Sequence, residues 1–127
     1  MANLRIYLEA VKVKGKYQLK LSDSEGNTGI DNLTSRAKRG FKVKWEKKRH
    51  PEIKIKDISK IGAKDGTDDI FGKSLKKVGQ NWVGRVKHDA AGKKEDYFIY
   101  YYVKGEDKEQ MVDPVIIVDS EDDDEQD

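Results

Sequence analysis

Apolar and polar residues alternate along most of this chain. Leu4, Ile6 and Leu8 are separated by polar residues, and the same alternation returns over residues 17–21. A period of two places successive side chains on opposite faces of a strand, which is typical of a sheet with one buried face. The short interval at residues 14–16 contains a glycine and predicts a tight turn. The first part of the chain is therefore expected to form a β-hairpin.

Five further strands follow from the same pattern. They are expected at residues 41–46, 53–56, 81–88, 97–103 and 111–118. Residues 97–103 give the strongest of these predictions because they are aromatic or β-branched. Ile58 and Ile61 fall out of the alternation, which indicates either a bulge or the end of a strand. Together the seven strands predict a single all-β domain over residues 1–118, folded as an antiparallel β-sandwich.

Two long connections interrupt the pattern. Residues 23–35 are rich in Ser, Asp, Asn, Gly and Thr, and residues 62–79 are rich in lysine with a small cluster of apolar residues. Such compositions are typical of loops. Helical periodicity is weak throughout the chain, and only residues 31–38 are a candidate for a helical turn.

Charge is distributed unevenly along the chain. Residues 1–56 carry 15 Lys or Arg and 6 Asp or Glu, whereas residues 57–118 carry 11 of each kind. Residues 119–127 carry seven acids and no base. The formal net charge of +2 therefore combines a basic body with an acidic tail. Because this tail has no apolar residue to bury, it is predicted to be disordered.

The chain contains no cysteine, and this narrows the possible chemistry. Disulfides, thiolate nucleophiles, iron–sulfur clusters and zinc sites with cysteine ligands are excluded. No apolar run is long enough to span a bilayer, and the N-terminus does not read as a signal peptide. The compartment stays open, with the cytoplasm expected if the chain is complete.

The second half of the chain carries a family resemblance. The stretches concerned are residues 43–45, 53–58, 69–71, 81–86, 97–103 and 113–118, all within residues 40–118. They resemble bacterial cupredoxin-like β-sandwich domains. The resemblance implies a Greek-key sandwich of about seven strands, cupredoxin-like or immunoglobulin-like in shape. It does not imply a blue-copper site, because His50, His88 and Met111 are present without the cysteine thiolate that defines such a site.

No catalytic constellation is recognisable. His50 lies among cationic neighbours that repel a metal, and His88 stands at the end of a predicted strand. The carboxylates of residues 65–69 lack the ligand series of an EF-hand. Neither a nucleophile elbow nor a glycine-rich phosphate loop is present. The sequence therefore predicts a non-enzymatic protein without a cofactor or metal.

A run of cations in the middle of the chain is the main candidate binding face. Its residues are Arg36, Lys38, Arg39, Lys42, Lys44, Lys54 and Lys56. Basic side chains bind phosphates, and exposed aromatic rings stack on bases. However, the alternation places Phe41, Val43 and Trp45 opposite the lysines of their strand, so these rings are expected in the core. The face is then either a solubilising surface or a non-specific site for nucleic acid or another polyanion.

The tyrosines of residues 97–103 are the second candidate. Tyr97, Tyr100, Tyr101 and Tyr102 are possible interaction residues. Alternation puts Tyr97 and Tyr101 on one face, and Tyr100 and Tyr102 on the other. The outward set is expected either to be exposed, as tyrosines that anchor interfaces are, or to be covered by residues 62–79.

These observations predict a non-enzymatic binding or accessory module. Its partner is expected to be a protein or a polyanion, with no membrane span and an open oligomeric state. The leading alternative is a nucleic-acid-binding or polyanion-binding protein that uses the basic face of residues 36–56. Three arrangements of the acidic tail stay open: it folds back on the basic body, it competes with an acidic ligand, or it stays free.

Overall fold

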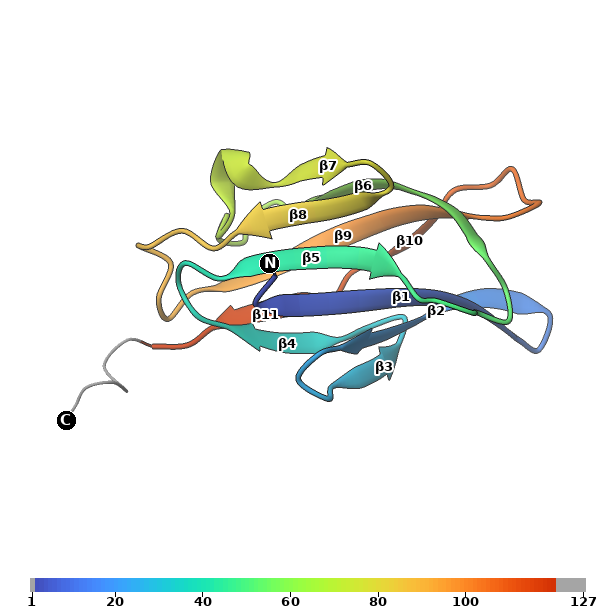
Figure 1. Ribbon diagram of the computed structural model, residues 1–127, viewed down its shortest axis with the longest axis horizontal. Coiled ribbons are helices and arrows are strands. Elements are labelled where there is room, and N and C mark those ends of the chain that lie inside the picture. Colours follow the sequence, from blue (N-terminus) through green and yellow to red (C-terminus); the bar gives the residue numbers. More distant parts are fainter. Residues whose placement is uncertain (1, 121–127) are drawn as a thin grey trace.

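The computed structural model describes residues 2–120 (Figure 1). Most of the predicted disordered tail, residues 121–127, lies outside the described residues. Eleven strands and one short 3₁₀ helix are present in the described part. They are β1 (Leu4–Val13), β2 (Lys16–Asp23), β3 (Thr28–Ile30), β4 (Thr34–Ala37), β5 (Lys42–Lys47), β6 (Ile55–Ala63), η1 (Gly72–Ser74), β7 (Lys76–Val78), β8 (Asn81–Arg85), β9 (Lys94–Val103), β10 (Gln110–Val112) and β11 (Val115–Val118).

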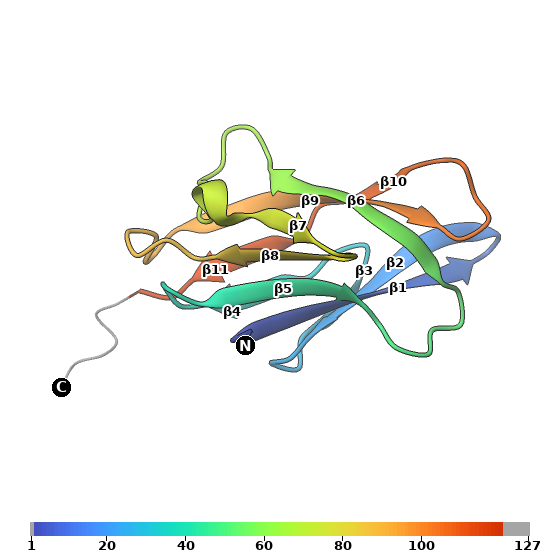
Figure 2. The ribbon, with the colours of Figure 1, turned by 45° about the horizontal axis from the view of Figure 1, so that its top comes forward.

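The strands form two sheets that pack face to face (Figures 1 and 2). The first sheet has the order β3-β2-β1-β5-β8-β7. In the second sheet β9 is central, with β6 along one side and β10 and β11 along the other. Strand β4 pairs with β11 at the edge. The predicted all-β, sandwich-like architecture is confirmed, and no helix of the described residues is long and apolar enough to cross a membrane.

The expectation of purely antiparallel sheets is wrong. Strand β1 pairs in parallel with β5, and β11 pairs in parallel with β4. Both pairs arise because the chain leaves the first sheet after β3, adds β4 to the second sheet, and returns as β5. A strand that is reached by such a crossover can lie parallel to its neighbour, whereas a short hairpin cannot produce this arrangement.

The strand count also exceeds the predicted seven. Residues 23–35, expected to be a connection, contain β3 and the start of β4. Residues 31–38, the candidate for a helical turn, instead hold strand β4, in which Ser35 and Ala37 are buried. Strand β7 lies within the predicted loop 62–79. These strands have three or four residues, too few for an alternating pattern to stand out.

Two local predictions are confirmed at the level of the backbone. Lys14 and Gly15 both have positive φ angles, of 52° and 80°, as a two-residue type I′ hairpin turn requires. Strand β6 shows shifts of register between Ile55 and Asp57 and between Ile58 and Lys60. Ile55, Ile58 and Ile61 are all buried although they recur every three positions. The bulges explain this spacing, because each extra residue shifts the alternation of faces by one position.

Three aromatic rings hold the two layers together. Trp45 of β5 is fully buried, and its ring meets Phe71 and Tyr97 edge-on at centroid distances of 5.4 and 5.7 Å. The Trp45 indole N–H donates a hydrogen bond of 3.1 Å to the hydroxyl of Tyr97 on β9. The prediction that Val43 and Trp45 face the core is therefore confirmed. At the edge of the layers, the indole N–H of Trp82 bonds the carbonyl oxygen of Ile58 at 2.8 Å.

We predict that Tyr97→Phe destabilises the fold by about 1–3 kcal/mol, because it leaves the buried indole N–H of Trp45 without an acceptor. The measurement is urea unfolding followed by tryptophan fluorescence. Tyr102→Phe is the matched control, since Tyr102 is only partly buried and its hydroxyl has no hydrogen bond to a described residue. This control is expected to change stability by less than about 0.5 kcal/mol. Equal effects of the two substitutions would contradict the role given to Tyr97.

Candidate functional site

The structure distributes the predicted basic residues over several elements. Lys42 and Lys44 lie on the outer face of the first sheet, in β5. Arg36 lies on β4 at one edge of the second sheet, whereas Lys56 lies on β6 at the other edge. Lys38 and Arg39 belong to the turn from β4 to β5, and Lys54 precedes β6. The residues of the run therefore do not form one continuous patch.

Lys42 instead joins cations that come from later in the sequence. A surface groove of about 450 Å³ lies over β5, β8, β7 and η1. We call it the basic groove, and its lining residues are Lys42, Lys73, Ser74, Lys76, Val78, Val83, Gly84 and Arg85. Four of these residues are cations and none is a carboxylate. The sequence did not indicate that residues 73–78 contribute to this site, because residues 62–79 have the composition of a loop. The lining residues from this segment are Lys73, Ser74, Lys76 and Val78.

Strand register explains why these cations gather. Lys42 is the direct partner of Arg85 across β5 and β8. Val83 is flanked by Lys44 on one side and by Lys76 of β7 on the other. Cross-strand partners have neighbouring side chains on the same face of a sheet. Like charges side by side in this way repel each other, and a bound anion would relieve the repulsion.

The backbone around the groove is held by hydrogen bonds. The Arg85 guanidinium donates to the carbonyl oxygen of Gly40 at 2.8 Å. The Ser74 hydroxyl donates to the carbonyl oxygen of Phe71 at 2.7 Å and accepts the Arg85 N–H at 2.8 Å. Phe71 in turn occupies the space above Gly84, where an added Cβ would lie 2.8 Å from its ring. The groove is thus fixed to the core through one buried ring.

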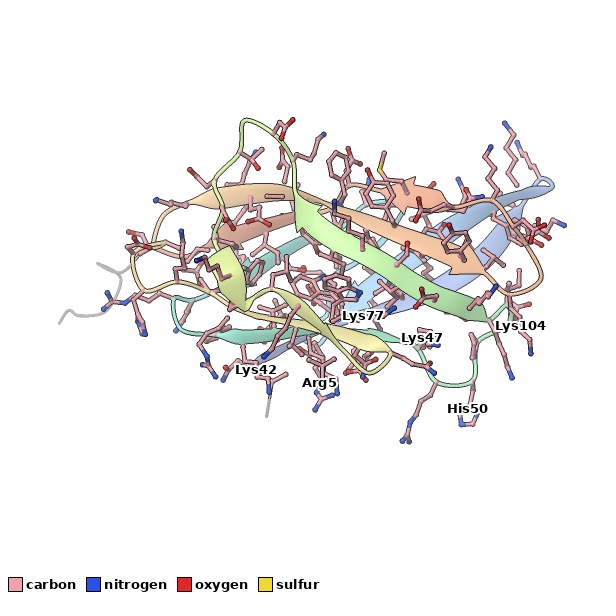
Figure 3. All side chains as sticks on the ribbon, turned by 90° about the horizontal axis from the view of Figure 1, so that it is seen from above. Arg5, Lys42, Lys47, His50, Lys77 and Lys104 are labelled. Carbon is pink, nitrogen blue, oxygen red and sulfur yellow. The ribbon has the colours of Figure 1, made fainter. Side chains whose placement is uncertain are left out.

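A second hollow of about 490 Å³ lies further along the same face. It is lined by Arg5, Tyr7, Ser22, Glu46, Lys47, Lys48 and Arg49. Here Arg5 forms an ion pair of 2.8 Å with Glu46. Figure 3 shows Arg5 and Lys42 pointing away from the second sheet, on the outer side of the first sheet. Because the second hollow contains its own carboxylate, it is the weaker site for an anion.

The tyrosine strand has one buried face and one partly exposed face. Tyr97 and Tyr101 are buried in the core and cannot contact a partner directly. Burial raises the pKa of Tyr101 to about 12 and raises that of Tyr97 further. Tyr100 and Tyr102 point to the outer face of the second sheet and are partly exposed. From residues 62–79, Lys64 lies over this outer face, with its ammonium 5.7 Å from the ring centre of Phe98.

Glu95 is a buried acid that the alternation pattern does not reveal. Its side chain is 1% exposed, and one carboxylate oxygen accepts the N–H of Ile70 at 2.8 Å. Burial raises the pKa of Glu95 from 4.5 to about 7; the Ile70 N–H opposes this rise and the negative charge of Asp69 adds to it. A perturbed pKa often marks a catalytic acid. Glu95, however, lines neither hollow and instead anchors the loop that carries Ile70 and Phe71.

The other chemical candidates remain apart from one another. His50 and His88 are exposed in separate loops. Within residues 2–120 no three His, Asp or Glu side chains are placed to hold a metal ion. Asp23 is nearly buried and accepts hydrogen bonds from Asn27 and from the Ser35 hydroxyl, the latter at 2.6 Å. This carboxylate therefore joins β2 of the first sheet to β4 of the second and serves structure.

We predict that stability falls as the pH rises from about 5 to 8, relative to a Glu95→Gln variant. The unfolded chain loses the Glu95 proton near pH 4.5, whereas the folded chain keeps it up to about pH 7, so the native state binds more protons within this window. The wild type should lose about 1–3 kcal/mol relative to the variant. Urea unfolding at several pH values measures the free energy of unfolding of both proteins. The titration of the two histidines contributes equally to both and therefore cancels in their difference. A difference that does not vary with pH would contradict the assignment.

Comparison with known proteins adds no family to these findings. No protein-family model matches the chain, and a search of curated proteins finds no matching sequence. The role of the molecule must therefore be argued from its own charge, shape and burial. On these grounds the basic groove is the candidate site, since it is the hollow in which several cations meet without a carboxylate.

Proposed function

We propose that this chain is a non-enzymatic β-sandwich module that binds a polyanion in the basic groove. The observation that carries the proposal is the meeting of Lys42, Lys73, Lys76 and Arg85 around one hollow without a lining carboxylate. Three separate segments of the chain supply these cations. An anionic ligand gains energy here from several charges at once, and part of that energy comes from the release of counterions.

Phosphate oxygens of a nucleic acid backbone are the ligand groups that this groove suits best. Lysine contacts phosphate as a point charge, and arginine can add a bidentate contact. The uncharged lining residues are Ser74, Val78, Val83 and Gly84, so no aromatic ring lines the groove for stacking on bases. Trp45 is likewise unavailable because it is buried. Binding should therefore depend on charge and be largely independent of base sequence.

The proposal includes the shape that the sequence resemblance implied. A Greek-key, cupredoxin-like sandwich without a redox copper site provides a rigid scaffold, and the binding surface lies on one outer face of it. A second docking surface, for a protein, is supported by Tyr100 and Tyr102 and by Met111, which is 49% exposed beside them. The charged groove is the stronger candidate because it combines a concave surface with a defined ligand chemistry.

We predict that the triple variant Lys42→Gln, Lys73→Gln and Lys76→Gln binds a labelled 20-nucleotide single-stranded DNA at least about tenfold more weakly at low salt. The slope of log K against log salt should fall by about 0.7 for each phosphate that the variant no longer neutralises. Fluorescence anisotropy over a range of salt concentrations measures both quantities.

The matched control removes three cations at the opposite end of the molecule. Lys104 is labelled there in Figure 3, and its backbone N–H bonds the carbonyl oxygen of Lys54. The variant Lys54→Gln, Lys56→Gln and Lys104→Gln has the same net charge as the groove variant. It should weaken binding by less than about threefold. Equal weakening by the two variants, or no binding by the wild type at low salt, would refute the proposed groove.

A further inference from the structure

The acidic segment of residues 119–127 begins beside a concentration of cations. The Asp119 carboxylate forms an ion pair of 3.0 Å with Arg36. Its backbone N–H bonds the carbonyl oxygen of Ala37 at 2.8 Å, and the carbonyl oxygen of Val118 accepts the N–H of Gly92 at 3.0 Å. The chain thus leaves the sandwich between the turn from β4 to β5 and the turn from β8 to β9. Figure 1 shows both turns at the same end of the molecule as the end of β11.

These two turns and the strands next to them carry many cations, and Asp89 is the one carboxylate within the turns themselves, residues 38–41 and 86–93. We use the name basic end for Arg36, Lys38, Arg39, Lys42, Arg85, Lys87 and Lys93, all of which lie on these elements. Lys42 and Arg85 also line the basic groove, so the basic end and the groove share two cations. The segment that follows contains six acids within residues 121–127. The acidic segment therefore begins, at Asp119, next to cations that lie far from it in the sequence.

We propose that residues 119–127 bind the basic end within the same molecule and compete there with the polyanionic ligand. The competition rests on the proposed function, whereas the intramolecular contact does not. Because the segment is tethered next to its site, its effective concentration is of the order of millimolar, which makes many weak ion pairs effective. A polyanion of higher charge density displaces the segment from these cations.

Chain length limits the segment to this end of the sandwich. Seven residues span at most about 25 Å. Gly40, whose carbonyl oxygen binds Arg85, is three residues from Ala37, or at most about 11 Å by Cα steps. In contrast, β1 starts at the basic end, where Asn3 bonds Lys42, and runs for ten residues. Its far end is about 30 Å away, so Lys12 lies beyond the reach of the segment.

The first experiment measures the contact without any ligand. A neutral-tail variant carries Glu121→Gln, Asp122→Asn, Asp123→Asn, Asp124→Asn, Glu125→Gln and Asp127→Asn. Amide chemical shifts in ¹H–¹⁵N spectra at 20 mM salt are compared with those of the wild type. We expect differences concentrated at residues 38–42 and 85–93, and we expect them to vanish at 500 mM salt because of screening. Differences confined to residues 119–127 would overturn the inference.

Two further variants, each made with and without the neutral tail, test which cations are involved. Lys38→Gln, Lys42→Gln and Lys87→Gln together should abolish most of the shift differences caused by the tail. The control set Lys12→Gln, Lys16→Gln and Lys104→Gln has the same charge and should leave those differences in place. If both sets abolish them equally, the tail acts only through net charge and the proposed contact is wrong.

A binding experiment then separates this competition from the proposed function. At 50 mM salt the neutral-tail variant should bind the 20-nucleotide DNA at least about fivefold more tightly than the wild type, and the gain should disappear at 300 mM salt. The same gain must be absent from the variant with Lys38, Lys42 and Lys87 replaced. Tail-dependent shifts without DNA binding by either protein would refute the proposed function and leave the intramolecular contact in place. Equal DNA affinities of the two proteins would refute the competition.

Discussion

The contact of Trp45 with Tyr97 and Phe71 is the constraint on which the outer surface depends. It joins β5 of the first sheet, β9 of the second sheet and the loop before η1 at one buried point. A strand has only two faces, so a tryptophan that is fixed inward forces its neighbours outward. Lys42 and Lys44 consequently point to solvent, and a slip of β5 by one residue would bury both ammonium groups. The core residue and the basic surface are therefore two consequences of one register.

The same contact also positions the groove residues that follow Phe71 in the sequence. Phe71 fills the space over Gly84, and the chain then turns through η1 into β7, which places Lys73, Ser74 and Lys76 beside β8. The preceding residue, Ile70, is held by buried Glu95. Deprotonation of Glu95 leaves a charge in the core, and the N–H of Ile70, in the loop that positions these groove residues, partly stabilises it. Groove geometry and the stability of the core are thus coupled through this short loop.

Sequence alternation predicted the features that depend on burial within a single strand. It placed Val43 and Trp45 inward, identified the turn at Lys14 and Gly15, and detected the irregularity near Ile58. It could not predict which strands become neighbours, because pairing across the sheets depends on contacts distant in sequence. The meeting of Lys42 with Arg85, and of Lys44 with Val83, is of this kind. Glu95 was equally invisible, since a single glutamate among lysines and aspartates has the composition of a solvated turn.

The parallel pairing of β4 with β11 determines where the acidic segment begins. Ala37 is opposite Val118, so both strands end at the same point and Asp119 emerges next to the basic turn that follows β4. In an antiparallel pair, Asp119 would instead lie beside the start of β4, about 13 Å away along the strand. That separation exceeds the Debye length of about 8 Å at physiological salt. One topological choice, which alternation alone did not reveal, therefore starts the acidic segment next to the basic end.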